Sequence, residues 1–336
     1  MNVEFLKKWG LFGLVLFFMA AIIVGCGIQE QNSPDEPSVT ESDVEEEKSD
    51  SGDSDDLFPV TITDDAGREV TIETEPESIV SIQASNTEIT FALGLGDKVI
   101  GVSDFCNYPA EALEVEKVGG QDMNAELVLT LLPDIALVTD YHYNTHPDIL
   151  EQYEEAGINV VVVGSSTSFD DVYDKIEMIA TVTGSQSAGG EIISDMKERH
   201  DAIKEQAEEL VTEQKKVWVE VSPAPDIFTT GQNTFMHEML ESIQAINAAE
   251  EQEGWVTLTE EEIVQLNPDV IITTYGYYVE NPRDDVLARD GWAEVPAIKN
   301  EQVYDVDNDT VTRPGPRLIE GVETLAKLIY PDVFEQ

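Results

Sequence analysis

One arrangement of residues occurs twice in this chain of 336 residues and constrains its fold more than any other feature. The stretch ELVLTLLPDIALV begins at Glu126, and EEIVQLNPDVIIT begins at Glu261, 135 residues later. Proline lacks an N–H group and disfavours helix in the residue before it, so each copy predicts a helix that ends at Pro-Asp and leads into a buried strand. The repeat predicts two similar lobes. The alternative is a coincidence between two unrelated helix-to-strand joints, because Leu-x-Pro-Asp is common there.

The rest of the chain alternates between helix and strand patterns in the same way. VTITDDAGREVTIE predicts a β-hairpin. Further strands are predicted at IVSI, KVIGVS, IALV and INVVVVG, and again at KVWVEV and QVYDVD. Between these two groups, residues 187–215 carry apolar positions at helical spacing without an internal proline, which predicts one helix about 40 Å long. The predicted fold class is α/β, with two α/β lobes whose central sheets are mostly parallel, joined by a single long helix.

The N-terminus, residues 1–26, is typical of a lipoprotein signal peptide. Lys7 and Lys8 precede the apolar segment LFGLVLFFMAAIIV, which is shorter than a typical transmembrane helix. Gly25 and Cys26 follow it directly. This ending resembles a lipobox, which implies that Cys26 carries lipid and anchors the protein to the outer face of the cell membrane. The alternative is an ordinary signal peptide or short anchor. The other cysteine, Cys106, then has no disulfide partner and is either a buried apolar residue or a reactive or metal-binding thiol.

The chain is strongly acidic, with 69 Asp and Glu against 18 Lys and Arg and a formal net charge of −51. Such a charge repels phosphate backbones, so we expect no nucleic-acid partner. Residues 27–57 hold 12 acidic side chains and one lysine, which predicts a disordered acidic tether. The predicted domains are therefore the signal peptide (1–26), the tether (27–57), an N-terminal lobe (58–184), an interlobe helix (185–215) and a C-terminal lobe (216–336).

Catalytic motifs are absent from the sequence. We find no Gly-x-Ser-x-Gly elbow, no His-Glu-x-x-His and no phosphate-binding loop, so we expect neither an enzyme nor a cofactor. His142 and His146 lie in DYHYNTHPD, after a predicted strand, where ligands often bind in α/β sheets. With only four histidines in the chain we expect no metal site there. The loop is then either exposed or in contact with a large ligand.

Four stretches of the folded part resemble the substrate-binding lipoproteins of ABC importers for iron-siderophores, haem and cobalamin. They are ASNTEITFALGLGDKVIGVSDFCNYP, VGGQDMNAELVLTLLPDIALV, FTTGQNTFMHEML and TRPGPRLIEGVETLAKLIYP. The resemblance covers residues 58–336 and is closest to the cobalamin-binding members. It implies the class III periplasmic binding protein fold, in which a helical backbone joins the lobes, and a ligand cleft between the lobes.

The same resemblance gives the repeated glutamates a role. In this family each lobe presents a glutamate, seven residues before the proline of Pro-Asp, to arginines of the membrane permease. The matching positions are Glu126 and Glu261. Two carboxylates on rigid lobes suit a two-fold permease, because Arg–carboxylate pairs are directional. The alternative is a solvated glutamate that the helix dipole favours.

The resemblance also implies which side chains line the cleft. Trp255 stands six residues before Glu261, where the cobalamin binders carry a cleft tryptophan, and Phe105 stands where they carry a tyrosine. At Gly120 they carry a second tryptophan, so this departure leaves the exact ligand open. The expected ligand-binding residues are Phe105, Tyr108, Tyr141, Phe228, Trp255, Tyr275, Asp309 and Arg313. The alternative for the aromatic residues is core packing, and for Arg313 an ion pair with surface acid.

The expected function is therefore the capture of a corrinoid such as cobalamin and its delivery to an ABC permease dimer with its ATPase. An iron(III)-siderophore or haem is the alternative ligand for the same type of importer. The few arginines in the C-terminal lobe, Arg283, Arg289, Arg313 and Arg317, favour the less charged corrinoid. A surface sensor or adhesin without a transport role is a third reading.

Overall fold

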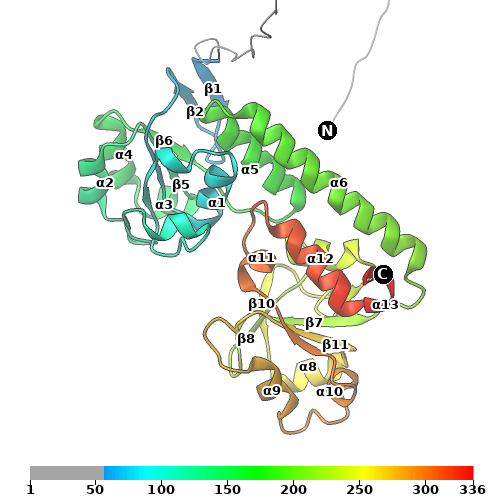
Figure 1. The fold of residues 1–336 in the computed structure, drawn as a ribbon. Helices are drawn as coiled ribbons and strands as arrows, with labels where there is room; N and C mark the ends of the chain where they lie inside the picture. Colours follow the sequence, from blue (N-terminus) through cyan, green and yellow to red (C-terminus); the bar gives the residue numbers. More distant parts are fainter. Residues whose placement is uncertain (1–56, 336) are drawn as a thin grey trace, which may run out of the picture. The chain divides into compact units, whose positions relative to one another are not determined.

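The computed structural model describes residues 57–335 (Figure 1). The predicted signal peptide with Cys26 and nearly all of the predicted tether lie outside the described residues. Within residues 57–335, no helix combines the length and the apolar character that crossing a membrane requires.

The first lobe is built on a parallel sheet of four strands in the order β4-β3-β5-β6. These strands are β3 (Ile79–Ser81), β4 (Val99–Val102), β5 (Ile135–Val138) and β6 (Asn159–Val162). An antiparallel hairpin of β1 (Val60–Thr63) and β2 (Glu69–Ile72) precedes it, as the sequence predicts. The helices of this lobe are α1 (Ala84–Ala92), α2 (Ala125–Leu131), α3 (Asp140–Thr145), α4 (Pro147–Glu155) and α5 (Phe169–Val182), with short 3-10 turns at Gly96–Lys98 and Ala110–Leu113.

The second lobe repeats this plan with a parallel sheet in the order β12-β11-β7-β9. Its strands are β7 (Lys216–Glu220), β9 (Ile246–Asn247), β11 (Val270–Thr273) and β12 (Val303–Asp305). A separate antiparallel pair consists of β8 (Ile227–Thr230) and β10 (Trp255–Leu258). The helices are α7 (Phe235–Ser242), α8 (Glu260–Leu266), α9 (Pro282–Leu287), α10 (Pro296–Lys299), α11 (Asn308–Thr312), α12 (Leu318–Ile329) and α13 (Pro331–Phe334). The predicted fold class is confirmed.

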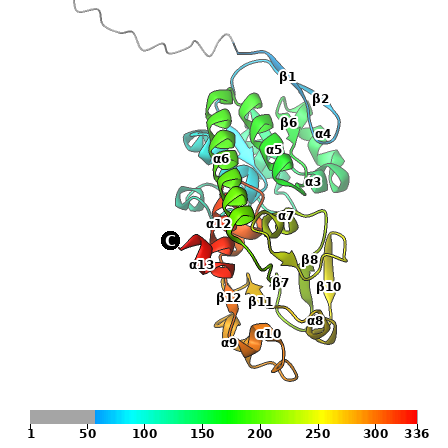
Figure 2. The same cartoon turned by 90° about the vertical axis from the view of Figure 1, so that its right-hand side faces the viewer.

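A single helix, α6 (Gln186–Leu210), joins the two lobes (Figure 2). At 1.5 Å per residue its length is about 38 Å. It ends five residues earlier than the predicted range of 187–215. The backbone turns to an extended conformation at Val211, and the N–H of Lys215 donates to the hydroxyl of Tyr330 instead of a helical carbonyl.

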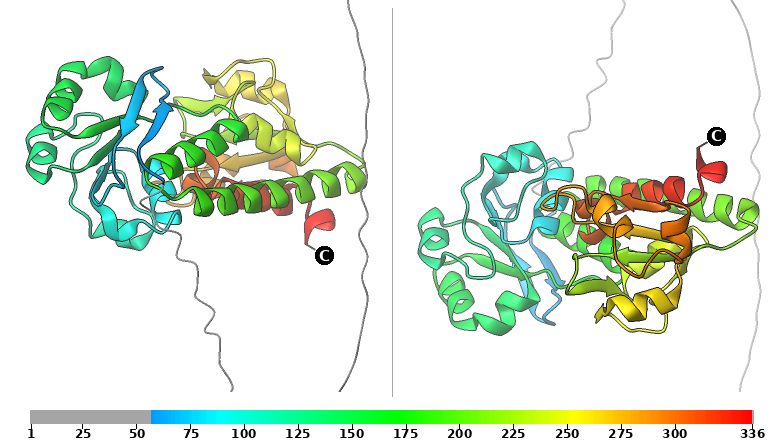
Figure 3. Two further views of the ribbon diagram at one scale, coloured as in Figure 1. Left: turned by 90° about the horizontal axis from the view of Figure 1, so that it is seen from above. Right: turned by 90° about the horizontal axis from the view of Figure 1, so that it is seen from below.

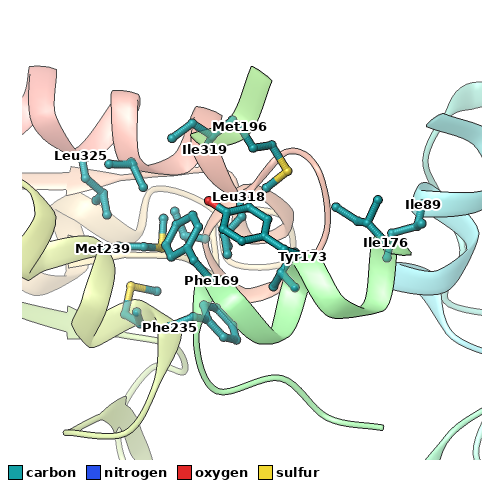
Figure 4. Packing of buried hydrophobic residues seen from close by; sticks show 14 of the residues in the cluster. Ile89, Phe169, Tyr173, Ile176, Met196, Phe235, Met239, Leu318, Ile319 and Leu325 are labelled. Atoms are coloured by element: carbon teal, nitrogen blue, oxygen red, sulfur yellow. The ribbon is translucent and has the colours of Figure 1, made fainter. Parts of the chain in front are cut away.

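Each sheet packs differently on its two faces. Helices of the same lobe cover one face of each sheet. Val128 of α2 belongs to the apolar cluster on this face in the first lobe, and Ile263 of α8 belongs to the corresponding cluster in the second lobe. The other faces of both sheets join one continuous apolar core that runs through α5, α6, α7 and α12. Figure 3 shows α6 and α12 side by side, and Figure 4 shows this shared core with Phe169, Met239 and Leu318 close together. The lobes are therefore joined by a packed layer of helices as well as by one chain segment.

Candidate functional site

A cavity of about 440 Å³ lies where strands of the first lobe end, facing residues of the second lobe. We call it the front cavity. Its lining residues are Ile82, Gln83, Ser85, Phe105, Gly120, Gln121, Thr139, Asp140, Tyr141, His142, Val163, Gly164, Ser165, Ser166, Phe235, Trp255, Thr312 and Pro314. Ile82, Thr139 and Val163 directly follow β3, β5 and β6, so the cavity is at the carboxyl end of the sheet, where α/β folds bind ligands. None of these lining residues is a lysine or an arginine.

Three of the predicted ligand-binding aromatic residues line this cavity and remain exposed. Phe105 is 67% exposed, Trp255 is 51% exposed, and Tyr141 is 42% exposed. Phe228 does not line the cavity, but the pairing of β8 with β10 places it on the same face of that two-stranded sheet as Trp255. Exposed aromatic rings are costly unless a partner covers them, so this group is suited to the face of a large ring-shaped ligand.

The departure from the family pattern at Gly120 has a structural counterpart. A Cβ atom at Gly120 would lie 2.7 Å from the ring of Phe105. That separation is shorter than carbon atoms tolerate, so a tryptophan at position 120 and the present placement of Phe105 exclude each other. The Phe105 ring occupies the space beside Gly120 and supplies an aromatic surface there.

The two histidines of the 140–146 segment hold a neighbouring loop. Nδ1 of His142 accepts from the N–H of Thr139, so its Nε2 carries the proton and donates to the carbonyl of Gly120 at 3.1 Å. Burial lowers the pKa of His142, which keeps this ring neutral. Nε2 of His146 lies 3.1 Å from the carbonyl of Gln121. Among residues 57–335 no three His, Cys, Asp or Glu side chains are grouped to hold a metal ion.

Tyr275 was expected in the cleft, and the structure places it in the interior instead. It is 1% exposed, and its hydroxyl donates to Oε2 of Glu220 at 2.9 Å. The same carboxylate accepts from Nε1 of Trp218 and, at 2.6 and 2.8 Å, from two nitrogens of Arg289. Burial raises the pKa of Tyr275, so its hydroxyl stays protonated and donates. Tyr275 is not among the residues that line the front cavity. The next aromatic residues, Tyr277 and Tyr278, are exposed.

Three other predicted ligand-binding residues meet at an ionic network between the lobes. Arg313 donates to Glu88 of α1 and, through Nη2, to Oδ1 of Asp309 at 2.8 Å. Asn107 bridges the lobes, donating to Oδ2 of Asp309 at 2.8 Å and accepting from Arg313 at 2.9 Å. The guanidinium of Arg317 stacks on the ring of Tyr108, 3.7 Å from its centroid. We call these residues, with Glu88, the interlobe network.

Sequence reasoning did not identify Glu88 or Asn107 as members of a site. Glu88 is the only charged residue in ASNTEITFALG, and a lone charge inside an apolar helix signals a buried partner. Its partners lie more than 200 residues away, so sequence spacing gives no indication of them.

A larger cavity of about 960 Å³ lies behind this network, among α1, α6 and α12. We call it the rear cavity. Tyr108 and Arg317 line it, together with Glu88, Phe91, Glu111, Glu191, Ile192, Asp195, Met196, Arg199 and Glu320 among others. Despite its size it is remote from the strand ends, so the front cavity is the better candidate for ligand capture.

The repeated motifs occupy equivalent places in the two lobes. Glu126 and Glu261 are both the second residue of a seven-residue helix, after the N-caps Asn124 and Thr259. Each helix ends at a residue in the left-handed conformation, Leu132 or Asn267, with φ of 48° and 53°. The repeat is thus an element of the fold, used once per lobe.

The aspartates of the two Pro-Asp pairs have a structural role, which explains why both copies of the motif contain one. Oδ2 of Asp134 accepts from the N–H of Ser78, just before β3, and Oδ2 of Asp269 accepts from the N–H of Lys216, where β7 begins. Each aspartate therefore ties the helix-to-strand turn to the start of the neighbouring strand. The glutamates make no comparable contact, since both are exposed and neither side chain has a partner within residues 57–335.

Comparison with known proteins gives consistent matches over the folded part. The family model described as "Periplasmic binding protein" matches residues 79–310. An uncharacterized ABC transporter substrate-binding lipoprotein of Bacillus subtilis, YvrC, is 45% identical over 331 residues, which are 98% of this chain and 99% of that protein. A cobalamin-binding protein of Halobacterium salinarum is 29% identical over 285 residues, covering 81% of this chain and 74% of that protein.

A solved structure shows the same fold. It is a possible iron-binding (periplasmic solute-binding) protein from Staphylococcus epidermidis, 31% identical, with a TM-score of 0.68. The match covers 76% of this chain and all of that one.

Proposed function

This chain belongs to the periplasmic binding protein family, whose members bind solutes for transport and are not enzymes, and we propose that it captures a corrinoid in the front cavity for an ABC importer. The permease dimer of that importer, with its ATPase, would then receive the corrinoid. The observation that carries the choice of ligand is the composition of the front cavity, with aromatic residues on both lobes and no cationic side chain in its lining.

The charge of the cavity favours a neutral ligand over an anionic one. Haem propionates and catecholate siderophores need arginine or lysine partners when they are buried. Arg313 and Arg317 are the arginines nearest in sequence to the lining residues Thr312 and Pro314. Both already donate hydrogen bonds, Arg313 to Glu88 and Asp309 and Arg317 to Glu88. A corrin ring with amide side chains carries no such requirement, and its broad face suits Phe105, Tyr141 and Trp255.

An iron(III) chelate or haem is the second candidate, and the Staphylococcus epidermidis relative favours it. That protein is described as a possible iron-binding protein and is 31% identical to this chain, slightly more than the cobalamin-binding relative of Halobacterium salinarum.

Delivery is proposed to depend on Glu126 and Glu261. They lie on α2 and α8, which pack on the face of each sheet that is turned away from the shared core, and neither glutamate lines the front cavity (Figure 1). Lipid on Cys26 is proposed to hold the protein at the outer face of the cell membrane, in keeping with the lipoprotein description of the Bacillus subtilis relative.

The test is direct binding of coloured ligands to the purified full-length protein. We expect cyanocobalamin to bind at micromolar concentration or below, and the Trp255→Ala variant to bind about fivefold more weakly, because one stacked aromatic contact contributes roughly 1 kcal/mol. Leu210→Ala, which removes a similarly exposed apolar side chain from the end of α6, is the control and should bind normally. Absence of cyanocobalamin binding together with tight binding of a ferric siderophore would replace the corrinoid by the second candidate.

A further inference from the structure

Two arginines of the second lobe converge on one carboxylate of the first lobe. Glu88 comes from α1, and its side chain is 2% exposed. Arg317 donates to both of its oxygens, at 3.0 and 2.6 Å, and Arg313 donates to Oε1. All three side chains are largely removed from water, with the two arginines 12% and 13% exposed.

This group of ions borders both cavities. Ser85, one turn before Glu88, lines the front cavity, as do Thr312 and Pro314 on either side of Arg313. Glu88 and Arg317 line the rear cavity. Arg313 therefore lies between two residues that line the front cavity, whereas Arg317 lines the rear cavity.

We propose that Glu88 determines the charge selectivity of the front cavity by occupying Arg313 and Arg317, so that the cavity discriminates against anionic ligands. The proposal rests on the proposed function in one respect, that the front cavity is the ligand site. An anionic ligand would have to displace a hydrogen-bonded buried pair and leave Glu88 buried without a partner, which is unfavourable. Specificity of this kind acts by penalising the wrong ligand.

The charges of the network show what the loss of Glu88 changes. Glu88, Asp309 and the more distant Asp307 face Arg313 and Arg317, so the group carries one net negative charge. Glu88→Gln preserves the size of the side chain and one acceptor, but it removes the buried negative charge and leaves Asp307 and Asp309 as the only acids that pair with the two arginines among residues 57–335. The two guanidinium groups then lose the carboxylate that both of them share, so they become better partners for a ligand carboxylate or catecholate.

The experiment compares two ligands that differ in charge. Cyanocobalamin is electrically neutral, and a ferric tris-catecholate complex is strongly anionic. Glu88→Gln is expected to bind the anionic complex at least tenfold more tightly than the unmodified protein does, and this gain should shrink as salt is raised. Glu320→Gln is the matched control: it removes one carboxylate from the rear cavity, and Glu320 has no side-chain partner among residues 57–335. It should show no gain.

The outcomes separate the proposal from the assignment of the ligand. A folded Glu88→Gln variant that gains no affinity for the anionic complex overturns the proposal, as does an equal gain in Glu320→Gln, because bulk charge would then explain it. If Glu88→Gln does not fold, Asp309→Asn is the test, and it should give a smaller gain of the same sign. If the unmodified protein binds no corrinoid, the proposed function fails, while the ratio between variant and unmodified protein for the anionic complex still decides the role of Glu88.

Discussion

Charge reversal at the two repeated glutamates should abolish delivery without affecting ligand capture. The structure gives Glu126 and Glu261 the same position in equivalent helices and no partner within residues 57–335, so their carboxylates are free to pair with permease arginines. A hydrogen bond to a charged group contributes roughly 1.5–3 kcal/mol. Removal of one glutamate should therefore weaken the complex with the permease about 10- to 150-fold.

Removal of both glutamates should have nearly additive effects, because the two helices lie in different lobes. The double variant is expected to lose about 3–6 kcal/mol of binding free energy, and lysine should be worse than alanine because like charges then oppose. The loss should appear mainly as faster dissociation, since the remaining acidic surface still steers the encounter.

Glu262 provides a matched control beside one of these residues. It is exposed and lies next to Glu261, but its carboxylate accepts from the N–H and the hydroxyl of Thr259 in a capping box. These hydrogen bonds lower the pKa of Glu262, because they stabilise its ionised carboxylate at the start of α8. Glu262→Gln should therefore dock normally.

The assay measures permease binding and uptake in reconstituted membranes, after cyanocobalamin affinity has been checked for every variant. Normal import by the Glu126→Lys, Glu261→Lys double variant would refute the docking role and reduce the repeat to a shared element of the fold. Equal impairment by Glu262→Gln would show that general acidity, and not these two positions, is recognised.

Three further predictions concern stability and anchoring. Glu220→Ala leaves Arg289 buried without its carboxylate and should lower the free energy of unfolding by about 3–5 kcal/mol in urea titration, whereas Glu294→Ala, in an exposed pair, should cost less than about 1 kcal/mol. Burial lowers the pKa of His200 to about 4, so between pH 6.5 and 4 the unfolded state binds more protons; stability should fall by up to about 3 kcal/mol as pH decreases through this window, and His200→Gln should remove that component. Cys26→Ala should block incorporation of labelled lipid, and continued labelling would contradict the lipobox.

Some features could be predicted because they depend on local rules. The hairpin before the first sheet follows from alternation around a glycine turn, and Val60–Thr63 and Glu69–Ile72 pair as expected. The two Pro-Asp joints were equally predictable, because proline lacks an N–H group and disfavours helix in the residue before it. A helix that the sequence analysis did not single out, α5, carries a local signal as well: Ser168 and Asp171 form a capping box at its start.

Other features depend on contacts that no local pattern encodes. No proline or glycine follows Leu210 to mark the end of α6, and the N–H of Lys215 donates instead to the hydroxyl of Tyr330, which is 115 residues further along the chain. Tyr275 follows a strand of the second lobe and looks like a cleft residue, yet Glu220 and Arg289 hold it in the interior from other segments. An aromatic ring beside a cleft and one beneath it have the same sequence environment.

The shared core has a consequence for the order in which the chain can fold. Leu318, Ile319 and Leu325 of α12 complete the apolar core that also contains Phe169 and Ile89, and α12 lies almost at the end of the chain (Figure 4). The apolar core on the inner face of the first lobe is therefore complete only when α12 has been synthesised. Both lobes then become stable together, in one late step, once the C-terminal helix has arrived.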